Sequence, residues 1–496
     1  MKKILRYIIL TAISAMLVIA ANPAVFGNTV YAGEVPVLEV PVLMDMDEAA
    51  LFELINAARR DPLGVAESLG MDREDILNDL PDLREILING LPELEFDIRL
   101  YQTAGEHTLD MLENNYYAYE SIDGKSPEQR MKEAGYVASD AGEALGLIYF
   151  NNFINSEQAV FQIFENMYKD ELSPEWVGPR NILNPDFNDL GVGIGGGLYQ
   201  LGEITGNVYL ATCDYGARVE IYELQLLALV NQLRDKPAAV TQFFGVKVAA
   251  VLEIFPEYTD FYANGLPPLA FNSQLYSAAE VQIFDMLENK YWGHVSKEGV
   301  TPVMRIKAQG YVPIWAAESK SRLSTCFNAI SPANTVPSIF KNMFFNAFSS
   351  QGFRDHSMLA EKAIESGFRI MAAESKALSG ICGENVHITV GDFGASRIYD
   401  GPLLSGVIYE DFNENGLYDA GEGVSDVEVT VKTPGVAGIT KTVRTNPAGG
   451  YTVFLDPGRY RVSVGGAGEN EQIRWFTVEA DNVWKSFQVT GTQPLL

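Results

Sequence analysis

Cysteine is scarce in this chain, with three residues among 496. An odd count allows at most one intramolecular disulfide. Cys326 and Cys382 form the one plausible pair, because they lie in the same part of the chain; the alternative is that all three cysteines are buried as small apolar residues. A small scaffold built on disulfides is therefore excluded, and the domains must be stabilised by their hydrophobic cores.

Positive charge is also in short supply. Lys and Arg number 36 against 65 Asp and Glu, which gives a formal net charge of −29. An acidic surface of this size repels the phosphates of nucleic acids and of anionic membranes. We therefore expect neither of these as a partner, whereas a soluble protein that meets divalent cations fits this charge balance.

Apolar runs of membrane-spanning length are absent after the N-terminus. The chain begins with Lys2, Lys3 and Arg6, followed by an apolar stretch over 8–21 and small residues around Ala32. This pattern predicts a secretory signal peptide over residues 1–32, with an uncleaved anchor as the alternative. After cleavage, a linker over 33–46 would lead into a secreted chain without a transmembrane anchor.

The chain repeats itself at a constant offset of 175 residues. LINAARRDP at 54–62 corresponds to LVNQLRDKP at 229–237, and NGLPELEFDIRLY at 89–101 corresponds to NGLPPLAFNSQLY at 264–276. The period is far longer than that of a solenoid repeat. The pattern therefore indicates the duplication of a whole domain.

Both repeats have the same predicted order of elements. Helical patterns come first, for example at Leu51, Leu54 and Ile55, and each repeat ends in strand-like segments. Helices followed by antiparallel strands indicate an α+β domain. We predict two such domains in tandem, over residues 47–219 and 220–398.

The pattern changes after residue 401. Short segments of alternating apolar and polar residues replace the helical periodicity, and turns such as Asp456-Pro457-Gly458 separate them. The segments are 405–410, 427–432, 451–455, 459–464, 473–478 and 483–489. This series predicts an all-β, immunoglobulin-like sandwich over residues 402–496.

One stretch stands out in each repeat, at residues 113–143 and 288–318. The two copies differ chemically where Tyr119 stands in the first and His294 in the second. We expect a loop from this position to the final glutamate, followed by a helix. The matched framework residues are Arg130 and Arg305, Gly135 and Gly310, Tyr136 and Tyr311, and Glu143 and Glu318.

The order of these motifs resembles the CAP superfamily in its bacterial form, which groups cysteine-rich secretory proteins, insect antigen 5 and plant pathogenesis-related proteins. The resemblance covers roughly residues 47–218 and 220–397. It implies an α-β-α sandwich with an open cleft, where two His and two Glu can hold a divalent metal such as zinc. The motifs that carry it are His294, Gly299, Arg305, Gly310-Tyr311 and Glu318, with Gly142-Glu143 and the segment 180–185 in the first copy.

Only part of that metal set carries over to the first repeat. Glu143 and Glu165 occupy the two Glu positions, whereas Tyr119 replaces the first His and the second His position falls near Gly178. The resemblance therefore implies a degenerate site in the first domain.

In the second repeat His294 and Glu318 match, but Lys341 occupies the second Glu position. His356 lies close to the second His position, and His387 is a third histidine in the same repeat. Three imidazoles and Glu318 would form a zinc site if they converged. The alternative is a polar remnant that binds no metal.

The C-terminal region contains a twelve-residue pattern typical of a calcium loop, DFNENGLYDAGE. Because strands flank it, it resembles the loop of B-type repeats in surface adhesins of Gram-positive bacteria and not an EF-hand. We predict calcium as the cofactor, bound weakly at about 10⁻⁴–10⁻³ M, with an acidic surface turn as the alternative. The predicted ligands are Asp411, Asn413, Asn415, Leu417 through its carbonyl, Asp419 and Glu422.

These observations favour a secreted, calcium-stabilised protein that binds an extracellular ligand or cell-surface component without catalysis. A metal-dependent hydrolase acting from the second repeat, with His294 and Glu318 as its catalytic candidates, is the first alternative. The second is a structural component of the cell envelope or matrix.

Overall fold

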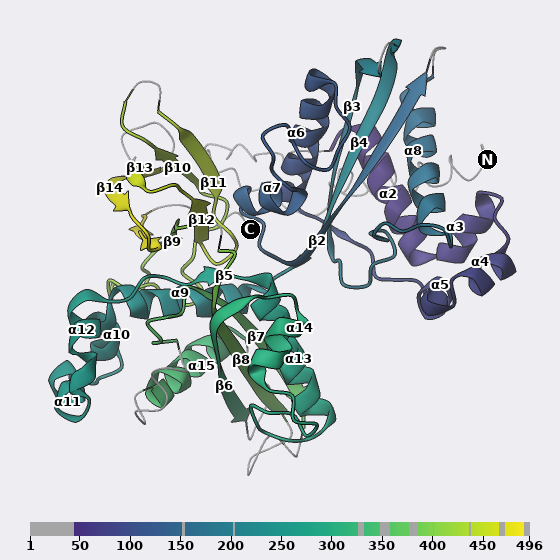
Figure 1. The fold of residues 1–496 in the computed structure, drawn as a ribbon. Helices are drawn as coiled ribbons and strands as arrows, with labels where there is room; N and C mark the ends of the chain where they lie inside the picture. Colours follow the sequence, from purple (N-terminus) through teal and green to yellow (C-terminus); the bar gives the residue numbers. More distant parts are fainter. Residues whose placement is uncertain are drawn as a thin grey trace, which may run out of the picture. The chain divides into compact units, whose positions relative to one another are not determined.

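The computed structural model (Figure 1) describes residues 44–150, 154–201, 204–325, 332–347, 358–375, 378, 385–399, 401–435, 438–465 and 472–490. The predicted signal peptide, most of the linker, Cys326, His356 and Cys382 lie outside these residues. The described residues form two compact units. Unit 1 contains those up to Met131 and from Asp140 to Arg218, and unit 2 contains Lys132–Ser139 and those from Val219 onward.

The first repeat is a three-layer arrangement of helices and a sheet. Helices α2 and α8 pack on one face of the sheet and α6 packs on the other. The strand order is β1-β3-β4-β2, with β3 and β4 antiparallel. The elements are α2 (Met46–Arg60), α3 (Pro62–Ser68), α4 (Arg73–Asp79), η1 (Pro81–Leu83), α5 (Arg84–Asn89), β1 (Glu95–Phe96), α6 (Ile98–Asn114), α7 (Pro127–Glu133), β2 (Ala138–Phe150), α8 (Ser156–Glu171), β3 (Asp189–Leu201) and β4 (Ile204–Arg218).

The second repeat has the same architecture, which agrees with the duplication seen in the sequence. Its strand order is β5-β7-β8-β6, with α13 on one face and α9 and α15 on the other. The elements are α9 (Ile221–Asp235), α10 (Pro237–Phe243), α11 (Val248–Ile254), η2 (Pro256–Tyr258), α12 (Thr259–Asn264), β5 (Ala270–Phe271), α13 (Ser273–Glu288), α14 (Pro302–Ala308), β6 (Pro313–Thr325), α15 (Pro332–Ala347), β7 (Glu365–Glu374) and β8 (Asn385–Ser396).

The C-terminal region is all β, as the alternating segments predict. One sheet has the order β11-β10-β13-β14, and in the other β9 pairs with β12, β15 and β16. A shared core of Val, Leu, Tyr and Phe side chains lies between them. The strands are β9 (Leu403–Tyr409), β10 (Glu428–Lys432), β11 (Thr440–Arg444), β12 (Gly450–Phe454), β13 (Gly458–Val464), β14 (Gln472–Val478), β15 (Val483–Trp484) and β16 (Phe487–Gln488).

Within unit 2, the all-β region packs directly against the second repeat, and we call this contact the joint. The side chain of Gln232 in α9 makes two hydrogen bonds to the backbone of Tyr418, at 2.6 and 3.0 Å. Asn482 Nδ2 donates to the carbonyl oxygen of Pro268 at 2.9 Å. Leu417 and Trp484 belong to the same buried cluster as α9 and α15. The second repeat and the all-β region are therefore joined by a continuous core.

In each repeat, a buried arginine connects segments that are distant in the sequence. Arg59 in α2 has no exposed surface, and it donates to four backbone carbonyls at 2.8–3.1 Å. Those carbonyls belong to two segments far from α2 in sequence, at Pro92 and at 182–187. Burial lowers the pKa of Arg59 to about 10, so the group stays charged at neutral pH.

Arg234 in α9 occupies the same place in the second repeat. It donates to the carbonyl oxygens of Pro267, Met358, Ala360 and Ala363 at 2.7–3.1 Å. Burial lowers its pKa to about 9. The arginines that the duplication matches by position are therefore matched by contacts as well.

Each helix that carries the arginine also fixes the Asn-Gly-Leu-Pro turn. Gly90 and Gly265 have φ of +73° and +71°, which favours glycine. A Cβ added at either would lie 2.5 Å from a carbonyl oxygen of α2 or α9. The glycine therefore allows the turn to pack directly against the helix end.

Two expectations from the sequence are wrong at the level of secondary structure. The stretches that end at Glu143 and Glu318 are not loops, because the helices α7 and α14 interrupt them and both glutamates lie in the long strands β2 and β6. Strand β11 was also missed. In β2 and β6, charged and small residues interrupt the alternation of apolar and polar residues that identifies a strand in the sequence. The burial of both strands comes from the helices that pack on them.

Among the described helices, no single one has the length and apolar character needed to cross a membrane. By length and composition alone, α10 and α11 meet that criterion as a pair bent by 106°.

We predict that Arg59→Ala lowers the free energy of unfolding of the repeat by about 3 kcal/mol or more, because four buried carbonyl groups lose their donor. Chemical denaturation, with hydrogen exchange to localise the effect, measures it. Arg60→Ala is the matched control. Arg60 is the next residue of α2, more than half exposed and paired with exposed Glu93, so it should change stability by no more than about 0.5 kcal/mol. Equal effects of the two substitutions would contradict the role of Arg59.

Candidate functional site

An ion pair between Arg130 and Glu143 forms the centre of the polar site in the first repeat. Glu143 in β2 is buried, and its Oε2 lies 2.5 Å from Nη2 of Arg130 in α7. Nη1 of Arg130 donates to the carbonyl oxygens of Tyr119 and Lys125 at 2.9 and 3.1 Å. The guanidinium therefore connects the loop that contains Tyr119 to the sheet.

His107 in α6 completes this cluster, although the sequence did not single it out. Its Nδ1 lies 3.2 Å from Glu143 Oε2 and 3.0 Å from Arg130 Nη2, and the residue is 1% exposed. Burial, with the nearby charge of Arg130, lowers the pKa of His107 to about 4. The imidazole is therefore neutral at physiological pH.

His107 was missed because the second repeat has Gln282 at the corresponding position, so the comparison of the two copies did not mark it. A usable signal was present in the helical periodicity. His107 falls on the same buried stripe of α6 as Leu100, Ala104 and Met111. A single histidine on an otherwise apolar stripe needs a polar partner in the core.

Asp214 in β4 adds a second buried carboxyl group. It accepts a hydrogen bond from Thr103 Oγ1 at 2.6 Å. Burial, together with the negative charge of Glu143, raises the pKa of Asp214 well above its usual range. We infer that Asp214 holds its proton at neutral pH, so one carboxylate faces one guanidinium and the cluster carries no net charge.

The second repeat contains the same pair, Arg305 and Glu318. Nη2 of Arg305 contacts Glu318 Oε2 and also donates to the carbonyl oxygen of His294 at 3.0 Å. His294 Nδ1 lies 2.6 Å from the other carboxylate oxygen of Glu318. Glu318 is buried, whereas 44% of the His294 side chain is exposed. The structure therefore brings the two catalytic candidates together at the protein surface.

Asp392 in β8 lies directly opposite Glu318 in the register of β6 and β8. It is fully buried, and neither of its carboxyl oxygens has a hydrogen-bond partner among the described residues. Burial, with the charge of Glu318, raises the pKa of Asp392 well above its usual range. Both repeats thus combine an Arg-Glu pair with a buried aspartic acid on the neighbouring strand whose pKa is raised.

Further cations surround Glu318 in the second repeat alone. Lys320 Nζ and the Arg322 guanidinium each lie 5.1 Å from the centre of the Trp292 ring. Burial lowers the pKa of Lys320 to about 8. The first repeat has Leu145 and Leu147 at these positions. The electrostatic surroundings of the two sites therefore differ.

The remaining residues predicted from the resemblance do not join these clusters. Glu165 lies in α8, in the layer opposite α6, and pairs with Lys169 at 2.7 Å. Tyr119 contacts Arg130 through its backbone oxygen, and the residue is 46% exposed.

His387, the third histidine of the possible zinc set, does not lie beside Glu318. In β8 it stands opposite Leu323 of β6, and the alternation of side chains places it on the other face of the sheet from Glu318 and Asp392. Burial lowers its pKa. Within the part of the chain that the structure describes, no group of three or more His, Cys, Asp or Glu is placed to hold a metal ion.

The predicted calcium loop is ordered by its own side chains. The two carboxylate oxygens of Asp411 accept from the backbone N–H groups of Asn415 and Gly416 at 3.0 and 2.8 Å. Asn413 Oδ1 accepts from Asn415 N–H at 3.1 Å, and Asn415 Oδ1 accepts from Leu417 N–H at 2.7 Å. Gly416 has φ of +77°, which permits the reversal of the chain.

Glu422 closes the same loop. Its buried carboxylate accepts from the N–H groups of Phe412 and Asp419 at 3.0 and 2.9 Å. Asp419 Oδ2 accepts from the side-chain amides of Asn413 and Asn415 at 2.8 and 2.6 Å. The available ligands are therefore oxygens, as calcium requires, and the two amides would have to turn their oxygens inward.

Comparison with known proteins gives one family match. No curated protein sequence matches the chain at a significant level. A solved extracellular protein with an SCP domain from Bacillus anthracis is 19% identical, over 35% of this chain and 40% of that one, with a TM-score of 0.20. An outer surface protein from Borrelia burgdorferi is 16% identical, over 33% and 96%, with a TM-score of 0.19. This chain thus spans less than half the length of the first structure. The family described as CAP, the cysteine-rich secretory protein family, matches residues 52–215 and 227–354, which is more than half of the chain.

We predict that Glu318→Gln and Asp392→Asn have unequal effects. Removing the Glu318 charge leaves Arg305 buried without a counter-ion, which should cost about 3–5 kcal/mol. Asp392→Asn replaces a protonated carboxyl group by a neutral amide of the same shape, so the cost should stay below about 1 kcal/mol. Denaturation followed by Trp292 and Trp315 fluorescence measures both. A larger loss in Asp392→Asn would show that this aspartate is charged.

We also predict that His107→Gln flattens the acid limb of the stability profile. The folded-state pKa of about 4 lies below the ordinary value of 6.5, so the unfolded chain binds a proton that the folded chain excludes. Stability is fully present above pH 6.5 and falls by up to roughly 3 kcal/mol as the pH drops to 4. The raised pKa values of Glu143 and Asp214 act in the opposite direction, but both residues remain in the variant. An unchanged slope in His107→Gln would contradict the assignment.

Proposed function

This chain belongs to the CAP family of cysteine-rich secretory proteins, and we propose that it acts outside the cell as a non-enzymatic binding protein whose C-terminal region is stabilised by calcium. Its partner would be an extracellular ligand or a component of a cell surface. The likeness of the C-terminal region to adhesin B-type repeats lies outside the family match and is part of this proposal. The family assignment agrees with the order of motifs in both repeats.

The single observation that carries the proposal is the pairing of the cleft glutamate with arginine in both repeats. Arg130 contacts Glu143, and Arg305 contacts Glu318. A divalent cation at either glutamate would have to displace a buried guanidinium. In the second repeat Lys320, whose charge also acts on Glu318, adds to the repulsion. These contacts favour a cleft that binds without metal catalysis.

The N-terminal sequence supports export. A basic start, an apolar run and small residues at a cleavage position are typical of secretory signals. A net charge of −29 suits a soluble extracellular protein.

The loop at 411–422 supports the calcium proposal. Asp411, Asn413, Asn415, Asp419 and Glu422 would supply side-chain oxygens, and Leu417 would supply its carbonyl. A bound cation would neutralise carboxylates that already lie close together, since the charge of Asp411 and Asp419 acts to raise the pKa of Glu422, secondary to burial. Because Tyr418 is held by Gln232, calcium would also stabilise the joint with the second repeat.

A hydrolase acting from the second repeat is the second candidate function. The observation that favours it is the exposed His294, held by Glu318 at 2.6 Å. A carboxylate that orients an imidazole is the arrangement used by general bases. A test for hydrolysis must therefore accompany the test for metals.

The metal content of the full exported chain tests the proposal. After equilibrium dialysis against calcium at a concentration above the predicted dissociation constant, we expect about one calcium and no zinc per chain by elemental analysis, and loss of the calcium in Asp411→Ala. The exposed Asp456→Ala is the matched control in the same region and should keep the calcium. His294→Ala should leave the metal content unchanged.

Two results would overturn parts of this proposal. About one zinc per chain, lost in His294→Ala together with a hydrolytic activity, would establish the hydrolase. Calcium retained in Asp411→Ala would exclude the loop as its site, independently of the cleft.

A further inference from the structure

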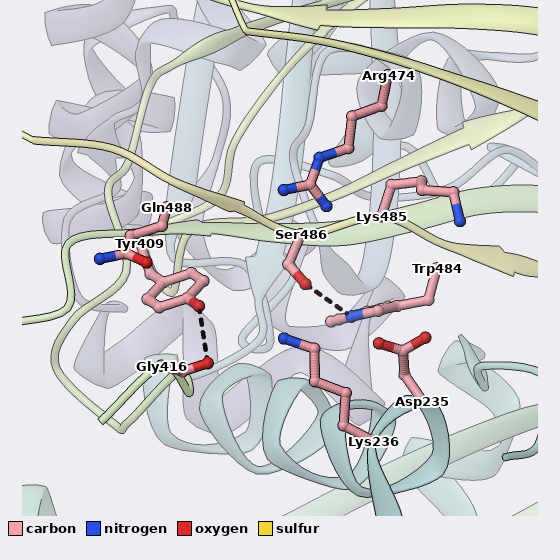
Figure 2. A pocket seen from close by; sticks show the side chains of 9 residues that line it. All are labelled: Asp235, Lys236, Tyr409, Gly416, Arg474, Trp484, Lys485, Ser486 and Gln488. Atoms are coloured by element: carbon pink, nitrogen blue, oxygen red, sulfur yellow. Dashed lines mark hydrogen bonds between the residues drawn. The ribbon is translucent and has the colours of Figure 1, made fainter. Parts of the chain in front are cut away.

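A cavity within unit 2, between the end of α9 and the all-β region, is a feature that neither the family nor the calcium loop accounts for. It has a volume of about 230 Å³. Its lining, labelled in Figure 2, is Asp235, Lys236, Tyr409, Gly416, Arg474, Trp484, Lys485, Ser486 and Gln488. Three of these side chains are cationic and one is acidic, so the cavity is positive in a chain whose net charge is −29.

The three cations come from different directions. Lys236 follows the last residue of α9, Arg474 lies in β14, and Lys485 follows β15. Figure 2 shows Arg474 and Lys236 extending toward the same space from opposite sides. No ion pair is formed by any of the three with a described residue, Asp235 included. The Lys485 side chain extends in another direction in Figure 2, so Arg474 and Lys236 are the two cations directed toward the same space.

Several contacts hold these groups in place. The Arg474 guanidinium lies 4.8 Å from the centre of the Phe487 ring. The backbone N–H of Lys485 donates to the carbonyl oxygen of Ser405 at 2.8 Å, and its carbonyl oxygen accepts from Tyr451 Oη at 2.5 Å. The core shared by α9 and the all-β region fixes the distance between Lys236 and the other two cations. The backbone positions around the cavity are therefore fixed by the core, whereas the side chains of Asp235, Lys236 and Arg474 are exposed at its opening.

A neutral donor and an apolar wall complete the cavity. Ser486 Oγ accepts from Trp484 Nε1 at 3.0 Å, which leaves the Ser486 hydroxyl hydrogen free to donate to a ligand. The Trp484 ring is almost fully buried and forms part of the lining. The cavity therefore offers charged donors, a hydroxyl donor and a small apolar surface.

The pKa of Asp235 is influenced by the three cations of the lining. Burial raises the pKa of Asp235, while the charges of Lys236, Lys485 and Arg474 act in the opposite direction. Asp235 also ends α9, where the helix dipole disfavours a negative charge. The lining itself thus holds three cations and one carboxylate, while the charges of Asp411 and Glu422 also reach Tyr409 at its edge.

We propose that this cavity binds a phosphate group. A phosphate monoester carries a charge of about −1.5 to −2 at neutral pH, which matches the excess of cationic over acidic side chains in the lining. Its oxygens point in several directions, as the three cations and Ser486 require, whereas a planar carboxylate presents only two. The volume lies below the range of about 300–1,000 Å³ for drug-sized ligands, so the ligand is a phosphate with at most a small substituent.

Isothermal titration of the full chain in calcium-free buffer tests this proposal, with inorganic phosphate and glycerol phosphate as the probes. We expect saturable binding of at least one of them. Binding of both identifies a phosphate carried on an organic group, and binding of inorganic phosphate alone identifies the free ion. Dimethyl phosphate, a monoanion with two blocked oxygens, should bind more weakly than either.

Substitutions of the lining residues should change the affinity for phosphate in a predictable direction. Arg474→Gln and Lys485→Gln should each weaken binding about tenfold, because each removes a charged donor. Asp235→Asn should tighten binding severalfold, because it removes the one negative charge of the lining. Arg459→Gln is the matched control, since Arg459 lies over Trp475 at 5.2 Å on the neighbouring strand and does not line the cavity.

Three results would overturn the proposal: no saturable heat with either probe at millimolar concentration, an equal loss of affinity in Arg459→Gln and Arg474→Gln, or weaker binding in Asp235→Asn. The last result would show that Asp235 contacts a positive group of a different ligand. Thermal unfolding of each variant establishes that it is folded before it is titrated.

Discussion

Each repeat depends on one buried arginine that binds only backbone carbonyls. Arg59 and Arg234 connect the first helix of their repeat to the Asn-Gly-Leu-Pro turn and to the segment that precedes the central strands. No other side chain can donate to so many carbonyls from one point while remaining charged. Because those segments also position the sheet, the polar cluster on its far face depends on the same contacts.

The polar cluster of each repeat is arranged around a second arginine, which neutralises the glutamate. Arg130 and Arg305 occupy the carboxylates that a divalent metal would need, and burial next to a carboxylate raises the pKa of the neighbouring Asp214 and Asp392. The repeats then diverge: His107 is buried in the first, whereas His294 is exposed in the second. The two repeats therefore share the Arg-Glu pair, but they differ in whether the histidine beside it is exposed to solvent.

Much of the fold could be predicted from the sequence, because its signals are local or periodic. The offset between the repeats, the apolar stripe of α13 and the alternating segments of the all-β region each correspond to elements of the structure. The long strands β2 and β6 could not be predicted in this way. Lys320 and Arg322 interrupt the apolar alternation of β6, and its place beside β8 is fixed by pairing over a long sequence separation.

The sequence by itself determined the duplication, the matched pairs Arg59 and Arg234, and the proximity of Asp411 to Glu422, since a short loop keeps its own residues together. Only the tertiary structure decided which distant residues share a site. It joined His107 to Glu143 across 36 positions, and it placed His387 on the other face of the sheet from Glu318. The physical reason is that strand register and helix packing fix side-chain direction, and neither is encoded in the spacing of single residues.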